Sequence, residues 1–168
     1  MTAEPRWLDD QERATWLAFL TASSLVARRL EQQLKDEAGL SHTQYEVLVQ
    51  LSAAEGRSLR MTELADMLIS SKSGLTYQVT QLERAGLVAR RSCPSDVRGV
   101  IAELTDRGME VLRQAAPGHV AAVRESLIDV LTPEQREHLA QGLGEVSRRL
   151  RGAGRTDPGQ QGQAGRLG

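Results

Sequence analysis

The sequence predicts a mainly α-helical fold with one small β-hairpin, on the basis of three features. Apolar residues recur at helical spacing over long stretches near both chain ends. Two short helical patterns, each preceded by a capping residue, lie mid-chain with a polar turn between them. After them the pattern changes to two short strands around a segment rich in turn formers. The 168 residues suffice for one domain with its own core.

Composition places the chain among ordinary globular proteins. Hydrophobic residues make up 40% and aromatic residues only 3%, so Leu, Val and Ala must supply most of the packing. The single cysteine, Cys93, has no intramolecular disulfide partner, which suits a reducing compartment. The first ten residues are acidic without an apolar run, and no stretch approaches the ~18 apolar residues of a membrane span. We therefore expect a cytoplasmic protein that does not enter a membrane.

The net charge of -1 is unevenly distributed. Residues 1–56 hold 5 Lys or Arg against 9 Asp or Glu, whereas residues 57–98 hold 7 against 4, a net +3. Residues 99–168 hold 9 of each. The middle segment is therefore the part most attractive to a polyanion, although a solvated face can also be basic by chance.

The N-terminal pattern predicts one long amphipathic helix from about Asp9 to Ala38. Its apolar face is Trp16, Phe19, Leu20, Val26, Ala27, Leu30 and Leu34, and its opposite face is Arg28, Arg29, Gln32, Gln33 and Lys35. Gly39 stands where a left-handed residue ends the helix. So long an amphipathic helix needs a partner, from the same chain or from a second copy.

Three shorter helices follow. The first runs to about Ala54 with Ser41 or Thr43 as its cap, and the next is a short helix with Thr62 as its candidate cap. The third spans residues 73–85, with Ser71 or Ser73 as cap and Gly86 at its end. Its apolar face is Leu75, Val79 and Leu82. Two short helices joined by a tight polar turn indicate a helix-turn-helix.

Residues 87–91 and 100–104 predict two strands, joined by a turn over Ser92–Gly99. A hairpin that follows a helix-turn-helix is a wing. The sequence thus predicts a winged helix-turn-helix over residues 41–104.

The C-terminal part returns to helical spacing. Thr105 caps a helix that continues to Leu131, with an interruption expected at Pro117 and Gly118. Thr132–Gln135 combines a capping box with a proline at the first helical position. We expect residues 9–38 and 106–151 to form a helical dimerisation region within a single domain, 9–151. Residues 1–8 are expected to be flexible and residues 152–168 to be a disordered tail.

The candidate DNA-binding residues lie on the polar face of the helix over 73–85 and on the hairpin. They are Ser71, Lys72, Ser73, Thr76, Tyr77, Gln78, Gln81, Arg84, Arg90, Arg91 and Arg98. Such a helix can enter the major groove, and its N-terminus attracts phosphate. We expect Tyr77 and Gln78 to contact base edges. Arg84 is a candidate for a phosphate contact or a helix cap.

Arg98 lies near the predicted tip of the wing, where a guanidinium can enter a narrow minor groove. Asp96 would support that loop through a salt bridge or a turn hydrogen bond. The alternative for Arg90, Arg91 and Arg98 is that they are ordinary solvated strand residues.

Four motifs together resemble the multiple antibiotic resistance regulator (MarR) family. They are Ser71-Lys72-Ser73-Gly74-Leu75-Thr76, Leu82-Glu83-Arg84-Ala85-Gly86-Leu87-Val88, Asp96-Val97-Arg98-Gly99-Val100 and Leu104-Thr105-Asp106-Arg107-Gly108. The resemblance covers roughly residues 10–150. It implies a homodimer built from both chain ends that binds palindromic double-stranded DNA. It also implies a regulator, usually a repressor, that is often released by a small phenolic or anionic effector.

The chain departs from this pattern at three positions. Val97 stands where many relatives have the first of two arginines, and Tyr77 and Gln81 stand where many have basic residues. The DNA-binding surface is therefore less charged than in those relatives. Some members sense oxidants with a cysteine in the first helix, but here Cys93 lies in the wing, where a bystander role is expected.

By the same resemblance, an effector cleft would lie between the dimerisation helices and the winged part. Its candidate lining is Trp16, Phe19, Arg28, His42 and Tyr45. The alternative is that the three aromatic residues are simply core.

Two other classes of function are alternatives. His42, His119 and His138 are dispersed and no catalytic motif or metal-ligand spacing is present, so we expect no enzyme activity, no metal and no cofactor. The second alternative is a winged-helix module that binds proteins without touching DNA. Its expected mark is a hydrophobic surface in place of the polar one.

Overall fold

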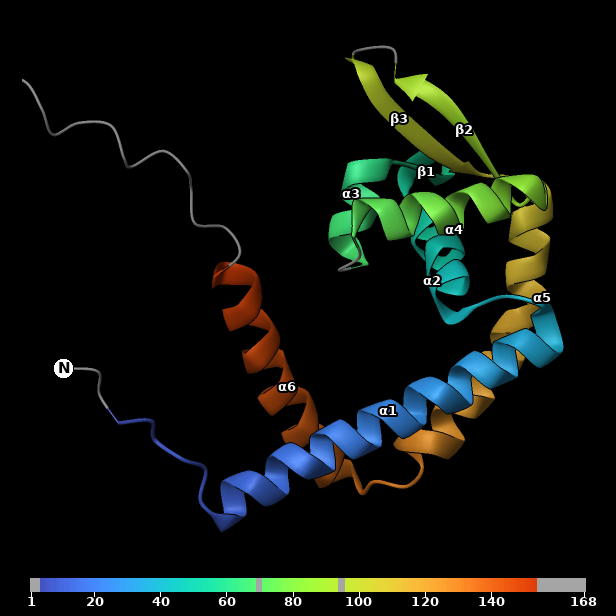
Figure 1. Cartoon of the computed structure of the whole chain (residues 1–168). Coiled ribbons are helices and arrows are strands. Elements are labelled where there is room, and N and C mark those ends of the chain that lie inside the picture. The colour runs from blue at the N-terminus through green and yellow to red at the C-terminus, as the bar shows by residue number, and fades with distance from the viewer. Residues whose placement is uncertain (1–3, 69–70, 94–95, 154–168) are drawn as a thin grey trace, which may run out of the picture. The chain divides into compact units, whose positions relative to one another are not determined.

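Two compact units make up the chain, Met1–Ser126 and Leu127–Gly168. The computed structural model describes residues 4–68, 71–93 and 96–153, without the side chains of residues 96–98 and 153. The first unit holds α1 (Asp10–Ala38), α2 (His42–Ala53), β1 (Ser58–Arg60), α3 (Met61–Met67), α4 (Lys72–Arg84), β2 (Val88–Cys93), β3 (Asp96–Leu104) and α5 (Asp106–Val123). The second holds α6 (Pro133–Ala153) (Figure 1). The predicted mainly helical fold with a small hairpin is confirmed.

α1 has the length that the sequence predicts. The Asp9 carboxylate accepts a hydrogen bond from the Glu12 backbone N–H, and the Glu12 side chain reciprocates, which fixes the start of the helix. Gly39 ends it with a φ of 65°, a left-handed conformation that glycine adopts without strain. Only Leu30, Gln33 and Leu34 are buried along its 29 residues. Most of α1 is therefore exposed in a single chain.

Gln33 is expected from the sequence on the solvent face of α1, and this prediction is wrong. It is only 3% exposed, and its Nε2 donates to Glu37 Oε2 over 2.8 Å. The cause is α5, which packs against this end of α1. A Cβ at Gly118 would meet the Glu37 carboxylate and lie 3.0 Å from Gln33 Nε2. Glycine at 118 thus allows the two helices to approach closely.

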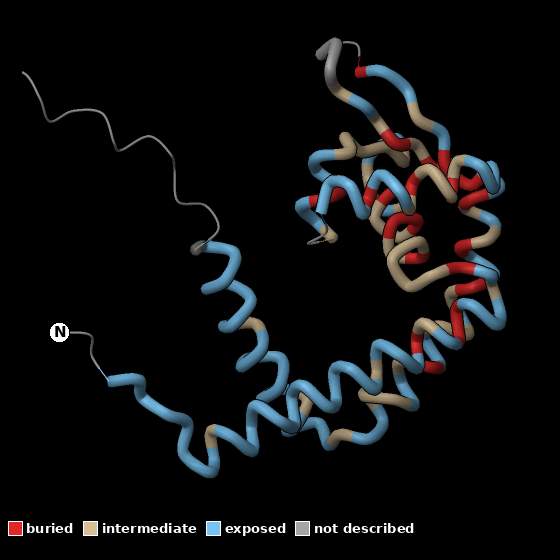
Figure 2. Tube along the Cα trace, viewed as in Figure 1, coloured by how far each residue is buried: buried red, intermediate tan, exposed pale blue. Residues whose placement is uncertain are grey.

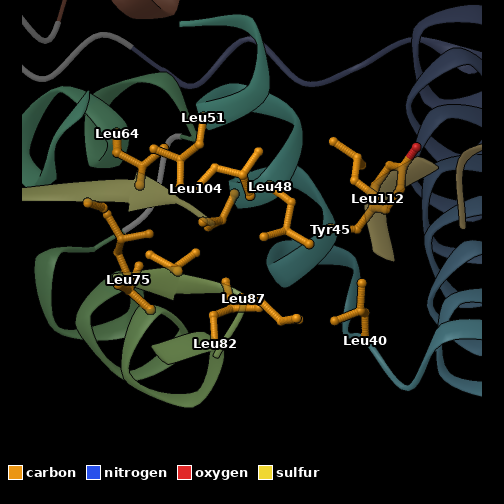
Figure 3. Packing of buried hydrophobic residues seen from close by; sticks show 14 of the residues in the cluster. Leu40, Tyr45, Leu48, Leu51, Leu64, Leu75, Leu82, Leu87, Leu104 and Leu112 are labelled. Atoms are coloured by element: carbon orange, nitrogen blue, oxygen red, sulfur yellow. The ribbon is translucent and has the colours of Figure 1, made fainter. Parts of the chain in front are cut away.

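One hydrophobic cluster joins the end of α1 to α2, α3, α4, the sheet and α5. Figure 3 shows its leucines and Tyr45 pointing toward one another from these elements. The fully buried side chains at its centre are Leu34, Val47, Leu48, Leu51, Leu64, Leu75, Val79, Leu82 and Val88. The dominance of Leu and Val follows from the scarcity of aromatic residues in the sequence. This core fixes the orientation of α4, whose opposite face is left to solvent.

The sheet has three antiparallel strands in the order β1-β3-β2. β1 is absent from the sequence prediction, because three residues carry no measurable period. The predicted turn is also too long: Ser92 and Cys93 belong to β2, and Asp96–Gly99 belong to β3. Pairing continues outward through Ser92↔Val100 and, after an irregularity, Cys93↔Asp96. Pro94 and Ser95 lie outside the described residues.

The predicted cap of α2 is confirmed, whereas that of α3 is wrong. Ser41 Oγ accepts from the Gln44 N–H, and the Gln44 side chain accepts from the Ser41 N–H, a reciprocal capping box. α3 begins one residue before Thr62, at Met61. Its start is fixed by the Glu63 carboxylate, which accepts from the Arg60 N–H over 3.1 Å. The acid at the third helical position replaces the expected hydroxyl.

A tight junction connects the end of α4, the start of β2 and the start of α5. Gly86 has a φ of 74° and lies between α4 and β2. Thr105, the cap of α5, donates through its backbone N–H to the Leu87 carbonyl and through its hydroxyl to the Gly86 carbonyl. A Cβ on Gly108 would collide with the Leu87 carbonyl oxygen. The first turn of α5 therefore lies directly against the α4–β2 turn.

The predicted interruption at Pro117 is wrong, because α5 runs through it to Val123. Ala115 before the proline and Ala122 after it are both buried, so packing holds both halves of the helix in place. A π-helical turn, Arg124–Ile128, follows α5. None of the helices within the described ranges is both long and apolar enough to cross a membrane.

α6 begins as predicted. Thr132 Oγ1 accepts from the Gln135 N–H, the Gln135 side chain accepts from the Thr132 N–H, and Pro133 is the first helical residue. The helix extends to Ala153, so residues 152 and 153, expected in the tail, are helical. The rest of the predicted tail, residues 154–168, lies outside the described part of the chain.

Candidate nucleic-acid interface

α4 has two chemically distinct faces. Leu75, Val79 and Leu82 are at most 1% exposed and anchor the helix to the core. Tyr77, on the other side, is 62% exposed, and Figure 2 shows exposed residues recurring along α4 between the buried ones. The exposed side chains predicted for DNA contact on this helix are Lys72, Ser73, Thr76, Tyr77 and Arg84, with Gln78 and Gln81 half-buried beside them. The structure thus brings the helical part of the predicted surface together.

The threonine hydroxyls and the glutamine amide on this face differ in the hydrogen bonds that they can still offer to a ligand. Thr76 Oγ1 donates to the Lys72 carbonyl and Thr80 Oγ1 donates to the Thr76 carbonyl, each over 2.8 Å. Their hydrogens are used within the helix, so these hydroxyls offer only lone pairs outward. Gln78 carries both donor and acceptor groups at its end, as an adenine edge requires.

The N-terminus of α4 combines a cap with a cation. Ser71 Oγ accepts from the Gly74 N–H over 3.1 Å and lies 3.5 Å from Ser73 Oγ. Lys72 is exposed beside them. Remaining N–H groups of the first turn and the Lys72 ammonium together favour an anion at this end of the helix.

The wing arginines differ in their surroundings. Arg91 Nε donates to Glu103 Oε2 on the neighbouring strand over 3.2 Å, and both side chains are about half exposed. Arg90 pairs with Glu83 of α4. Arg98 and Asp96 lie in β3, but their side chains are outside the described residues, so the proposed minor-groove contact and its support stay predictions.

The pair Glu83–Arg90 makes three hydrogen bonds. Arg90 Nη2 and Nε donate to Glu83 Oε2 over 2.6 and 3.0 Å, and the Arg90 backbone N–H donates to Glu83 Oε1 over 3.2 Å. The Arg90 guanidinium lowers the pKa of the Glu83 carboxyl below its usual value. Glu83 is not among the residues that the sequence predicts for the site. The available signal was an acid in the last turn of a helix, seven residues before the first arginine of the hairpin.

A second polar cluster lies where α1, α2 and α5 meet. The His119 ring of α5 lies 4.3 Å from the Tyr45 ring and 5.7 Å from the His42 ring, centre to centre. Glu31 Oε2 accepts from the His42 backbone N–H over 2.7 Å, and this bond is the main cause of the lowered pKa of Glu31. Burial, with the nearby His42, lowers the pKa of His119, and burial raises the pKa of Tyr45.

This cluster contains part of the predicted effector lining. It brings His42 and Tyr45 together, and it adds His119, whose buried Nδ1 has no hydrogen-bond partner among the described residues. Trp16 and Phe19 instead form a ring pair of their own, 6.2 Å apart. The alternative that the aromatics are core holds for Tyr45 but is wrong for Trp16 and Phe19, which are 51% and 44% exposed. Arg28 is also exposed on α1.

Large apolar side chains are exposed in both units. On the first unit most of them lie on α1 or just before it: Trp7, Leu8, Trp16, Leu17, Phe19, Leu20 and Leu25. On the second they form the stripe predicted for α6: Leu139, Leu143, Val146 and Leu150. Exposed apolar sets of this extent mark surfaces of association.

The described ranges contain no candidate metal centre. No group of three or more His, Cys, Asp or Glu side chains there is placed to hold a metal ion. Cys93 is buried at the end of β2.

Known proteins are similar to this chain in both sequence and fold. Residues 40–100 match the model of the MarR family. The crystal structure of Sco3205 from Streptomyces coelicolor, a MarR family transcriptional regulator in complex with DNA, is 45% identical, with a TM-score of 0.85 over 89% of this chain and 93% of that one. AbsC from the same organism is 43% identical, with a TM-score of 0.83 over 88% of this chain and 99% of its own.

A further relative is also a transcription regulator. The HTH-type transcriptional repressor YetL of Bacillus subtilis is 34% identical over 115 residues, 67% of this chain and 66% of its own. The named relatives are transcription regulators and not enzymes. From the winged helix-turn-helix, the shared motifs and these similarities together, we conclude that the chain belongs to the MarR family of transcriptional regulators.

Proposed function

We propose that the chain is a homodimeric, sequence-specific binder of double-stranded DNA that represses transcription from a palindromic operator. The carrying observation is α4, which buries one apolar face and presents hydrogen-bonding side chains on the other, beside a hairpin with arginines. The DNA complex of Sco3205, at 45% identity, supports DNA as the partner. The name of YetL supports repression.

α4 is the proposed recognition helix. In this proposal Tyr77 and Gln78 contact base edges in the major groove, with Thr76 and Gln81 beside them. Phosphates are contacted at the helix start by Ser71, Lys72 and Ser73, and at its end by Arg84. Arg91 and Arg98 supply the positive charge of the wing, whereas the charge of Arg90 is paired with Glu83.

A second copy of the chain is the proposed partner of the exposed apolar residues on α1 and α6. A two-fold dimer would place two copies of α4 in successive major grooves, ~34–36 Å apart, which matches a palindromic site. A small aromatic or anionic effector would act by favouring a dimer in which that spacing no longer fits. The proposed effector lining remains Trp16, Phe19, Arg28, His42 and Tyr45. Of these, His42 and Tyr45 lie beside the His119 ring.

The alternative of a protein-binding winged helix has less support. Its expected mark is an apolar outward face on α4, because the buried centre of a protein–protein interface is depleted in charged residues. Lys72, Ser73 and Thr76 instead make that face polar.

The test is fluorescence anisotropy with a duplex from the promoter region of the protein's own gene, measured across a salt series. Lys72→Ala should weaken binding to all sequences and lower the salt slope by about one unit, because it removes one phosphate contact. Gln78→Ala should lower the preference for the promoter duplex over random duplex about tenfold, because it removes a base contact.

Gln141→Ala on α6 is the matched control, because Gln141 is exposed and far in sequence from the recognition helix. It should leave both quantities unchanged. Absence of salt-sensitive duplex binding at low ionic strength, or a strictly monomeric protein, would overturn the proposal.

A further inference from the structure

The end of the recognition helix is tied to the base of the wing by a single carboxylate. Glu83, the next-to-last residue of α4, accepts three hydrogen bonds from Arg90, the third residue of β2. One of these comes from the Arg90 backbone N–H. Because β2 is an edge strand, this N–H would otherwise have no partner in the sheet.

Buried residues such as Val88, Ala102 and Leu104 and the Thr105 hydrogen bonds also hold the base of the hairpin, but its outer part has less support. The link from α4 to β2 is the short turn at Gly86. β1 supports β3 only along Ile101–Glu103, so beyond Arg91 the wing is a two-stranded ribbon. A lone ribbon of two strands is only marginally stable and bends easily. The angle between wing and helix is therefore set at the base of the hairpin, where the Glu83–Arg90 pair adds a polar link between α4 and β2 to these buried contacts.

The negative charge of Glu83 is by itself unfavourable for DNA binding, so its presence at this position needs another explanation. An acid in the last turn of a helix opposes the helix dipole, and near a duplex it repels phosphate. Arg90 lowers the pKa of this carboxyl, so Glu83 stays ionised. Pairing with Arg90 also neutralises the charge that this arginine would otherwise bring to the duplex.

We propose that Glu83 is a positioning residue for DNA recognition, which holds the wing at the angle that lets wing and recognition helix engage one duplex together. Arg90 then acts mainly through Glu83 and not as an independent phosphate contact. The inference rests on the proposed function, since it requires duplex binding by the wild-type chain.

The test compares Glu83→Gln and Glu83→Asp in the full chain, with the same labelled promoter duplex and salt series. Charge alone predicts that Glu83→Gln binds DNA more tightly, because it removes a negative charge. Positioning predicts the opposite sign: both variants should bind about 3- to 10-fold more weakly, as expected for loss of a partly exposed, charge-assisted hydrogen-bonded pair. Both should also lower the salt slope, because wing phosphate contacts are lost.

Glu103→Gln is the matched control. Glu103 also pairs with a wing arginine, Arg91, but both residues lie within the hairpin, so the pair does not join wing to helix. This variant should bind DNA as well as the wild type or more tightly. Urea unfolding of each variant checks that the fold is intact, and Glu83→Asp, which keeps the charge, tests the geometry by itself.

The outcomes separate the two proposals. If the wild type binds the duplex and Glu83→Gln binds equally or more tightly with an unchanged salt slope, the positioning role is wrong and the proposed function stands. The positioning role is also wrong if Glu83→Asp leaves the affinity unchanged. If the wild type itself shows no salt-sensitive binding, the proposed function fails and the positioning role fails with it.

Discussion

The winged part of the first unit and the N-terminal half of α1 differ in the solvent exposure of their apolar side chains. Leu48, Leu64 and Val79 are fully buried in the winged part, whereas Trp16 and Leu17 on α1 are more than half exposed (Figure 2). Both regions show the same helical period in the sequence. The helical period thus identifies an apolar face. It does not tell whether that face is buried within one chain or exposed for association with a second chain.

The largest expected effect lies in the winged part. Leu48→Ala removes a fully buried side chain from the centre of the cluster and should lower the free energy of unfolding by about 2–5 kcal/mol. Urea denaturation followed by circular dichroism measures this loss. Met67→Ala, at a side chain 47% exposed, is the control and should change stability by less than about 0.5 kcal/mol. Equal losses in the two variants would contradict the assignment of the core.

The next effect tests whether α1 is half of an interface. Trp16→Ala and Phe19→Ala remove a ring pair that is exposed in one chain. Each should raise the dimer dissociation constant by about 30-fold or more if the pair is central to a dimer, because buried aromatics dominate such interfaces. Sedimentation equilibrium measures this constant. Met67→Ala, at a side chain 47% exposed on α3, is the control and should have little effect. An unchanged dimer dissociation constant in both α1 variants would show that this apolar face of α1 is not the dimer interface.

The smallest effect belongs to the cluster at α1, α2 and α5. The pKa of His119 in the folded chain lies below its ordinary value of 6.5, so the unfolded chain takes up the proton first as pH falls. Stability should therefore be complete above about pH 6.5 and decline below it, down to the folded pKa. His42 and Tyr45 of α2 face this ring, and Gln33 and Glu37 of α1 lie beside the preceding Gly118.

His119→Gln should flatten the decline of the urea midpoint as the pH falls below about 6.5, because the titrating group is gone. The lowered pKa of Glu31 acts in a more acidic range, below its usual 4.5, so it does not obscure this window. His138→Gln, on the exposed surface of α6, is the control and should keep the wild-type profile. A profile that His119→Gln leaves unaltered would contradict the linkage.

The helices could be predicted from local signals, because caps and end glycines act over a few residues. Asp9, Ser41, Ser71 and Thr132 each cap the helix that is predicted to follow them. The errors came from tertiary contacts. Burial on both sides of Pro117 kept α5 continuous, and strand pairing carried β2 and β3 into the segment predicted as a turn.

The candidate site divides in the same manner. The position of Tyr77 and Gln78 opposite the buried face of α4 could be predicted, because a helix face follows from spacing and α4 has the predicted apolar anchor. The pairing of Arg90 with Glu83 was not predicted, because it depends on how the hairpin turns back onto the helix. His119 was likewise missed as a neighbour of Tyr45, since 74 residues separate them in the chain.

The missing side chain at Gly108 has a mechanical consequence. The backbone of α5 rests on the Leu87 carbonyl with no space for even a methyl group, and Thr105 hydrogen-bonds to the same carbonyl. Without a compressible layer between them, a displacement of the first turn of α5 must carry the α4–β2 turn with it. This close backbone contact couples the start of α5 to the α4–β2 turn, and so to the end of α4 and the first residues of the hairpin.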